Sequence, residues 1–264
     1  MKKISILSVF LAAILFGCNG KKTSATAEGE GLSFDSVVVD TILHLTDDPS
    51  SPSFTINFSL LYAKGKNAQT VNDSLLKRGL LTGREEGDTS TLEQATYEFV
   101  KQALDEYKEF NLPLFAQDPE HSESLNNIFE VKTEAHNAYD NVINIIGHIY
   151  YYGGGIHGTA ATVAYNIDAK TGKKIDIGDI CVPGYQPTLI NKLTKKLMER
   201  FNAKTEEELK DKIFLESSLY VPVDFIIGKD KITFIYGENE IASYSEGEIM
   251  LEIDRSELAD ILKK

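Results

Sequence analysis

A long stretch of this chain, from Asn141 to Ile167, contains no Asp, Glu, Lys or Arg. Charged residues make up 25% of the sequence and the formal net charge is -13, so an uncharged run of this length constrains the fold strongly. Strands that are covered on both faces have nearly continuous apolar sequences. We therefore expect Val142–Tyr152 and Thr159–Ile167 to be adjacent central strands, buried on both faces and joined by a glycine-rich connection at Gly153–Gly158.

Two more strands and a helix are expected nearer the N-terminus. Ser36–Leu45 is rich in valine and isoleucine, and Phe54–Leu60 alternates apolar and polar residues with period two. A turn rich in Asp, Ser and Pro separates these runs. Asn67–Leu81 is expected to be helical.

A second helix is expected to begin with a capping box at Ser90–Glu93, because the Ser hydroxyl and the Glu carboxylate can each satisfy an unpaired amide there. We expect this helix to end at Pro113, since proline cannot donate the backbone hydrogen bond. The polar run Gln117–Asn127 is expected to be a loop between two subregions. The apolar stripe of the helix recurs at helical spacing and consists of Leu92, Ala95, Phe99, Ala103, Tyr107 and Phe110.

The C-terminal region alternates between helix and strand patterns. A helix that opens at Pro187 carries leucines at helical spacing, and a hairpin is expected over Phe225–Tyr236. A last strand at Glu248–Ile253 is expected to lead into a helix capped by Asp254. This order predicts an α+β fold, an antiparallel sheet packed against helices with a smaller N-terminal α/β subregion. The expected organisation is 1–17 signal peptide, 18–32 flexible tether, 33–116 N-terminal subregion and 128–264 main α+β domain.

The N-terminus has the order of an export signal, in which Lys2 and Lys3 precede a short apolar run. Leu15-Phe16-Gly17-Cys18 resembles the lipobox of bacterial lipoproteins, and this resemblance implies lipidation of Cys18 and cleavage before it. We therefore expect an exported lipoprotein of the cell envelope, in the outer membrane facing the periplasm or the surface. The alternative is an ordinary secretory signal with an incidental cysteine.

The acidic composition limits the partners of the exported chain. A surface of this charge repels nucleic acid and anionic headgroups, so we expect no nucleic acid partner and a membrane contact through the lipid anchor only. A basic protein would be attracted, although the charge can also serve solubility alone. The other cysteine, Cys181, lies between Ile180 and Val182 and is expected to be buried.

Several motifs resemble the envelope domain of RsiV-type anti-sigma factors, which also accompanies the PdaC-type peptidoglycan deacetylase. They are Tyr152–Gly158, Tyr165–Asp168, Thr171–Lys173 with Ile175–Ile180, and a C-terminal pattern from Phe225 to Leu258. The resemblance extends over Ile128 to Leu262. It implies a non-catalytic domain that binds lysozyme in the anti-sigma factors, so we expect a binding protein for a basic protein such as lysozyme, or for peptidoglycan.

No catalytic or metal-binding motif is visible, and no cofactor is expected. The five histidines form no His-Glu-x-x-His or closely spaced metal pair, and there is no Gly-x-Ser-x-Gly elbow. Carboxylate pairs for glycan hydrolysis depend on the fold rather than on spacing in the sequence. A cell-wall glycan hydrolase or a deacetylase-associated enzyme therefore stays the alternative to a binding protein.

The glycine-rich connection is the predicted binding loop. His157 stands beside three glycines, where an imidazole and exposed backbone amides can both meet a ligand. The predicted binding residues are Tyr152, Gly153, Gly154, Gly155 and His157. The alternative is that the glycines only relieve a sharp turn. Alternation places Tyr150 and Tyr152 on one face of their strand and Tyr151 on the other.

Overall fold

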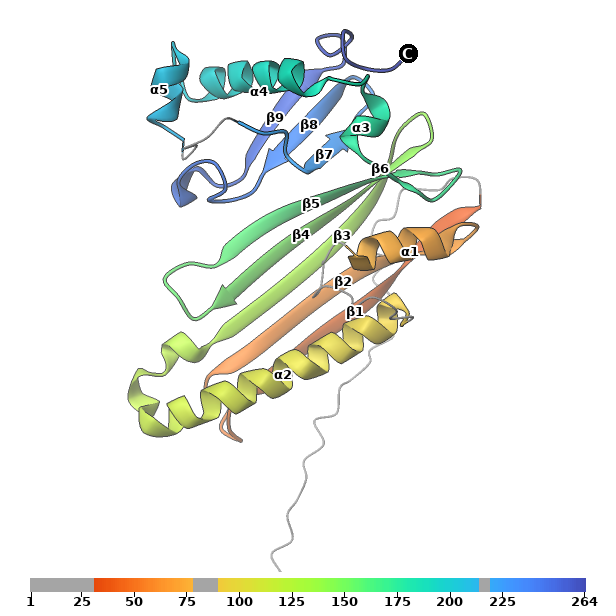
Figure 1. The fold of residues 1–264 in the computed structure, drawn as a ribbon. Helices are drawn as coiled ribbons and strands as arrows, with labels where there is room; N and C mark the ends of the chain where they lie inside the picture. Colours follow the sequence, from red (N-terminus) through yellow and green to blue (C-terminus); the bar gives the residue numbers. More distant parts are fainter. Residues whose placement is uncertain (1–30, 78–89, 214–218) are drawn as a thin grey trace, which may run out of the picture.

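The structure is a computed structural model that describes residues 31–77, 90–213 and 219–264. It has an α+β fold with a large sheet, a small sheet and helices packed against both, as the sequence predicts (Figure 1). The large sheet has the strand order β1-β2-β3-β4-β5-β6, and the small sheet has the order β7-β8-β9. All neighbouring pairs are antiparallel except β2 and β3, which are parallel.

Residues 32–77 and 92–175 form the large sheet and the helices on one of its faces (Figure 1). The elements, in chain order, are β1 Leu32–His44, β2 Ser53–Gly65, α1 Ala68–Lys77, α2 Leu92–Gln117, the 3-10 turns Pro119–His121 and Glu123–Leu125, β3 Asn127–Tyr139, β4 Val142–Gly153, β5 Thr159–Asp168 and β6 Lys174–Ile175.

The C-terminal third forms the small sheet and its helices beyond β5 (Figure 1). Its elements are α3 Ile177–Ile180, α4 Gln186–Arg200, α5 Glu206–Lys210, β7 Asp224–Ile227, β8 Lys231–Tyr236, the 3-10 turn Tyr244–Glu246 and β9 Ile249–Asp254.

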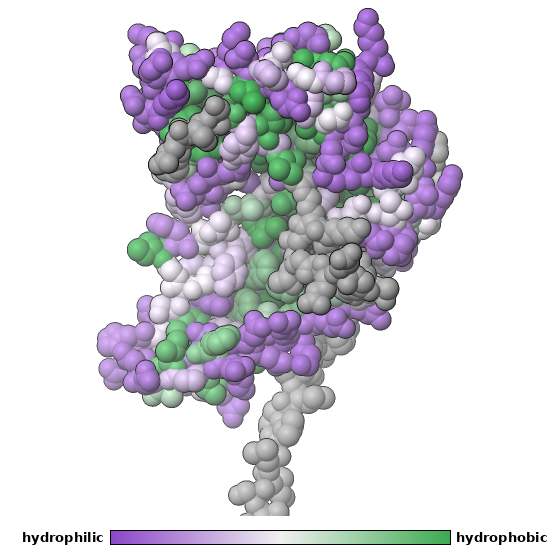
Figure 2. Space-filling view, in the orientation of Figure 1, coloured by the Kyte–Doolittle hydropathy of each residue, from purple (hydrophilic) through white to green (hydrophobic). Residues whose placement is uncertain are grey.

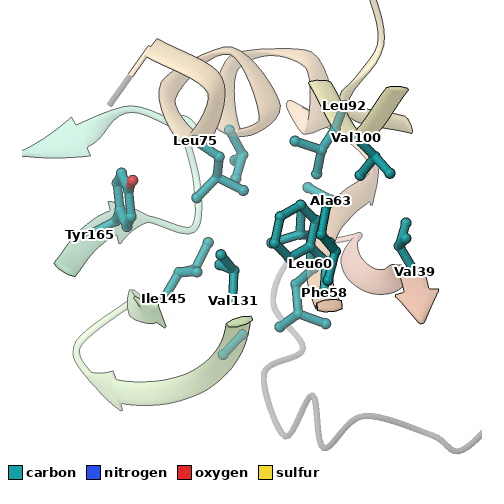
Figure 3. Packing of buried hydrophobic residues seen from close by; sticks show 14 of the residues in the cluster. Val39, Phe58, Leu60, Ala63, Leu75, Leu92, Val100, Val131, Ile145 and Tyr165 are labelled. Atoms are coloured by element: carbon teal, nitrogen blue, oxygen red, sulfur yellow. The ribbon is translucent and has the colours of Figure 1, made fainter. Parts of the chain in front are cut away.

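One hydrophobic cluster lies between the large sheet and α1 and α2 (Figure 3). Period-two alternation turns Phe58 and Val131 toward the helices, where Phe58 stacks on Phe99 of α2 with ring centroids 6.0 Å apart. Ile145 of β4 is fully buried in the same cluster. Burial of apolar surface at about 25 cal/mol per Å² makes this layer the main source of stability for the sheet.

The loop that was expected to separate two subregions, Gln117–Asn127, does not divide the sheet. Strand β2, before the loop, pairs with β3, after it, from Phe54–Asn127 to Ser59–Lys132. The two hydrophobic clusters instead divide after Ala169, because the second cluster is built from Leu189 onward. The N-terminal strands thus share one sheet with the β4–β5 hairpin.

Helix α2 differs from the prediction at both ends. Its capping box is formed by Thr91 and Gln94 rather than by Ser90 and Glu93, and this start places Leu92 in the core with 4% exposure. Pro113 lies inside the helix, which continues to Gln117. The predicted stripe holds at Leu92 and Tyr107, but Phe110 is 67% exposed. Phe115, in the last turn, packs against the core instead.

The C-terminal elements largely follow the sequence pattern. The leucines of α4 are buried against the small sheet, and the hydroxyl of Thr205 caps α5 by accepting from the amide of Glu208. The prediction of a helix after Asp254 is wrong, because turns follow this residue. The backbone of this last segment instead forms hydrogen bonds with residues at the end of α3. The amide of Val182 donates to the carbonyl of Ile261, and the amide of Lys263 donates to the carbonyl of Ile180.

The uncharged stretch forms the predicted antiparallel pair β4 and β5, in register from Val142–Asp168 to Tyr151–Thr159. Burial on both faces, however, applies only to the base of this hairpin. Ile143, Asn144 and Ile145 are buried in succession, whereas His148 and Tyr150 are exposed. The second face is covered only where the small sheet reaches it.

No helix among residues 31–77, 90–213 and 219–264 is long and apolar enough to cross a membrane. The predicted signal peptide, Cys18 and nearly all of the predicted tether lie outside the described residues. Cys181 is buried at 2% exposure, as predicted, and burial raises the pKa of its thiol.

Candidate functional site

The face of the large sheet opposite α2 carries two rows of side chains that cross five strands. The register of each strand pair defines them, because paired residues project to the same face. The Asp40 row consists of Asp40, Asn57, Glu130, Tyr150 and Ala160. The Val38 row consists of Val38, Ser59, Lys132, His148 and Thr162.

These rows line an open hollow with a cavity volume of about 680 Å³. All members except Thr162 contribute to it, together with intervening residues of the same strands. Hollows of 300–1,000 Å³ are typical of ligand sites. Val38 is 53% exposed and Tyr150 is 37% exposed, so apolar and aromatic surface is presented beside carboxylate, amide and imidazole groups.

The charges of the hollow are not balanced. Lys132 donates to Glu134 at 2.5 Å, and this bond holds the pKa of the Glu134 carboxyl below its usual value. The lysine charge is thus already neutralised by a neighbour on its own strand. Within the described parts of the chain, no salt bridge or hydrogen bond holds the carboxylates of Asp40 and Glu130. The hollow therefore presents two free negative charges on either side of Asn57.

The C-terminal part of the chain lies against the edge of β5, at one end of the hollow, and forms the wall there. Glu248 accepts hydrogen bonds from the backbone amide and the hydroxyl of Thr162, the latter at 2.7 Å. Glu238 accepts from the amide of Ala160 at 3.1 Å. These two carboxylates bind the outer edge of β5 and add negative charge at that end. On the molecular surface, hydrophobic residues lie between the small-sheet part, at the top of the view, and the large-sheet part below it, with hydrophilic regions on either side (Figure 2).

Two buried asparagines set the position of that wall. Asn166 donates to the carbonyl of Phe225 at 2.8 Å and accepts from the amide of Ile227 at 2.9 Å. Asn144, its cross-strand partner, donates to the carbonyl of Ile227 at 3.0 Å. These side chains satisfy the backbone of β7 as a neighbouring strand would, so the two sheets are held in one orientation.

The predicted binding loop lies at the tip of the β4–β5 hairpin, next to the hollow. Gly154 has φ +82°, and a Cβ there would collide with the carbonyl of Ser124. A Cβ at Gly158 would collide with the ring of Tyr150, which lines the hollow. At Gly154 and Gly158 there is thus no room for a Cβ atom. This agrees with the alternative to a binding role, in which the glycines only relieve a sharp turn. Ile156, at the tip of the loop, is 92% exposed.

His157 does not stand free at the loop tip. Its ring stacks on Tyr244 with centroids 5.0 Å apart and an interplanar angle of 22°. Tyr244 also donates to the carbonyl of Gly158 at 2.6 Å. Desolvation, Glu238 and Tyr150 all raise the pKa of the Tyr244 phenol. His157 therefore ties the loop to the C-terminal part of the chain while one side of its ring faces solvent.

The described residues around the hollow include no metal-binding cluster. No group of three or more His, Cys, Asp or Glu that could hold a metal ion occurs in the described ranges. His148 lies 3.4 Å from the hydroxyl of Thr162, but this hydroxyl donates to Glu248 and is mostly buried. The arrangement is suited to hydrogen bonding and charge recognition.

Solved structures share this architecture. A DUF3298-family protein from Bacteroides fragilis is similar over 89% of this chain and 95% of its own, with 22% identity and a TM-score of 0.76. A DUF3298-family protein from Pseudomonas aeruginosa is similar over the same shares, with 18% identity and a TM-score of 0.57. At these identities the likeness concerns the fold alone. No curated protein matches the chain.

The sequence comparison is more local. Residues 178–256 match the family described as a protein of unknown function, DUF3298. The matched residues lie in the last third of the chain, within Ile128–Leu262. They include Glu238, Tyr244 and Glu248 but not the β4–β5 hairpin, so the wall of the hollow is inside the DUF3298 match and its floor is outside.

The binding residues predicted from the sequence are not among those that line the hollow. Tyr152 and the glycine loop flank the hollow, whereas Asp40, Asn57, Glu130 and Lys132 were not singled out. The available signal was period-two alternation, which continues through Glu130, Lys132 and Glu134 in β3. Alternation alone does not show that β3 lies beside β2, so the sequence could not show that Asn57 and Glu130 belong to one row.

Proposed function

We propose that this chain is a lipid-anchored, non-catalytic binding protein of the cell envelope, and that it recognises a basic protein such as lysozyme or a fragment of peptidoglycan. The anchor rests on the lipobox resemblance at Cys18, and the binding role rests on the resemblance to the RsiV and PdaC envelope domain. The observation that carries the proposal is the hollow on the sheet face opposite α2, where no described residue pairs with the carboxylates of Asp40 and Glu130.

Several features support a binding role for this face. The floor is rigid, because its strands are paired throughout and the wall is attached through Asn166 and Glu248. Sites on rigid elements hold their recognition groups in place and reduce the entropic cost of binding. The hydrophobic, aromatic and polar groups of the floor are typical of recognition surfaces. The excess of carboxylates favours a positively charged partner.

The proposal is tested by titrating the full chain, in a neutral detergent, with lysozyme and separately with soluble peptidoglycan fragments. We expect lysozyme binding to weaken with salt, mostly through slower association, because surface charges are screened beyond about 8 Å at physiological ionic strength. Failure of both ligands to bind at low salt would contradict the proposal. The peptidoglycan should keep its mass during the titration, and cleavage would favour the hydrolase alternative. Cys18→Ala should release the protein from membranes.

The loop is tested with two variants of one residue. His157→Ala should speed release of the partner with little change in association, since it removes the stack on Tyr244 and loosens the loop. His157→Phe keeps a ring for that stack and removes the imidazole. If His157→Phe behaves like the unaltered chain, the histidine positions the loop. If it releases as fast as His157→Ala, the imidazole contacts the partner.

A further inference from the structure

We infer that the hollow between the Asp40 row and the Val38 row takes an extended peptide segment that carries two lysine or arginine side chains. This inference rests on the proposed binding function and names the chemistry of the segment that the hollow receives. It places the recognition on the sheet floor, where Asp40 and Glu130 would be the charge partners, rather than on the tip of the glycine loop.

The spacing of the carboxylates favours two cationic groups over one. Asp40, Asn57 and Glu130 occupy consecutive strands in one row, so the two acidic residues are separated by two inter-strand spacings, roughly 10 Å. At that backbone separation each carboxylate can meet a cationic group of its own. In a polyproline II segment, residues i and i+3 lie on the same side, about 9.3 Å apart. Such a segment matches the separation and leaves its backbone carbonyls near the side-chain amide of Asn57.

The other groups of the hollow are compatible with a cation. Lys132, the lysine of the floor, is paired with Glu134 at 2.5 Å, so its charge is compensated. Tyr150 follows Glu130 in the row and is 37% exposed, which allows a cation to lie against its ring. Val38 provides apolar surface for the methylene stem of a lysine or arginine.

The same charges disfavour an acidic ligand. Peptide stems of peptidoglycan carry carboxylates, which Asp40 and Glu130 would repel, and the neighbouring carboxylates of Glu238 and Glu248 add to this repulsion at the β5 end. A neutral glycan would not be repelled, but it would leave both acidic groups without a counter-charge. Charge complementarity therefore selects a basic peptide among the ligands that the proposed function admits.

The test uses the full chain immobilised in neutral detergent and three soluble probes. The first is acetyl-(Lys-Pro-Pro)4-amide, which has a lysine at every third position. The second is the same peptide with glutamine in place of lysine, and the third is chitotetraose, an uncharged glycan. We expect the lysine peptide to bind at low salt and the glutamine peptide to bind at least tenfold more weakly, since charge pairs supply most of its affinity.

The variant Asp40→Asn/Glu130→Gln removes the two charges with little change in shape at exposed positions. It should weaken the lysine peptide about tenfold, because each exposed ion pair is worth up to about fivefold in affinity. The matched control is Glu98→Gln/Glu109→Gln, which removes two exposed charges from α2, beyond the other face of the sheet. This control should leave the affinity within twofold.

Three results would overturn the inference. One is absence of binding by the lysine peptide at low salt. Another is an equal loss of affinity in the α2 control, which would assign the effect to net charge. The third is that chitotetraose binds, that the Asp40/Glu130 variant weakens this binding, and that the lysine peptide does not bind. This result would assign the hollow to glycan. If lysozyme or peptidoglycan still binds in any of these cases, the proposed function stands and only the inference fails.

Discussion

The base and the tip of the β4–β5 hairpin have the same uncharged composition but lie in different environments. At the base, Ile143 and Ile145 pack toward the helices while Asn144 and Asn166 meet β7, so both faces are covered. Toward the tip, one face still belongs to the core, but the other carries His148 and Tyr150 into the open hollow.

The difference shows that absence of charge has two causes in this chain. At the base, charges are excluded because burial of an unpaired charge costs far more than burial of an amide that is hydrogen-bonded. At the tip no such penalty applies to the open face, since His148 and Tyr150 are in contact with solvent. Histidine and tyrosine there combine apolar body with a polar group, which is typical of recognition surfaces. The uncharged stretch thus joins a structural half to a candidate functional half.

The largest expected effect is on the stability of the base. Ile145→Ala removes a fully buried side chain and should lower the free energy of unfolding by about 2–5 kcal/mol, through lost burial and the cavity that remains. His148→Ala, three residues along the same strand, should change it by less than about 0.5 kcal/mol. Urea unfolding of both variants measures the contrast. Similar losses in the two variants would mean that the halves do not differ in this way.

A smaller effect is expected at the tip, from backbone conformation. Gly154→Ala should cost about 2 kcal/mol, because φ is +82° there and the new methyl group would displace the carbonyl of Ser124. Gly155→Ala is the matched control, since its nearest neighbour would be the His157 carbonyl at 3.8 Å, an ordinary contact. Thermal unfolding of the two variants separates them. Equal melting temperatures would show that the loop adapts freely.

The smallest effect is expected at Glu134, which pairs with Ile146 where base and tip meet. Lys132 holds the pKa of Glu134 below its usual value of 4.5, so the ion pair stabilises the fold above that pH. Its contribution is lost as the pH falls through the lowered pKa. Both side chains are partly exposed, so Glu134→Gln should cost less than about 1 kcal/mol at pH 7. In urea unfolding at pH 7 and pH 3, the difference from the unaltered chain should shrink at pH 3; a constant difference would contradict the assignment.

Much of the local structure could be predicted from the sequence. The alternation of Phe54–Leu60, the uncharged hairpin and the leucines of α4 each indicated the right element, because the period of apolar residues reports which side of an element is buried. The prediction failed where two neighbouring residues could each cap the helix, as Ser90 and Thr91 can. Packing of Leu92 in the core decided between them.

The sequence by itself determined which side chains point to the same face of each strand, but only the tertiary structure decided which strands are neighbours. The parallel pairing of β2 with β3 joins residues more than 70 positions apart and brings Asn57 beside Glu130. Docking of β7 through Asn166 likewise covers the base of the hairpin and leaves the tip open. Periodicity is a property of a few adjacent residues, whereas the site depends on long-range register, which is set by packing of the whole sheet.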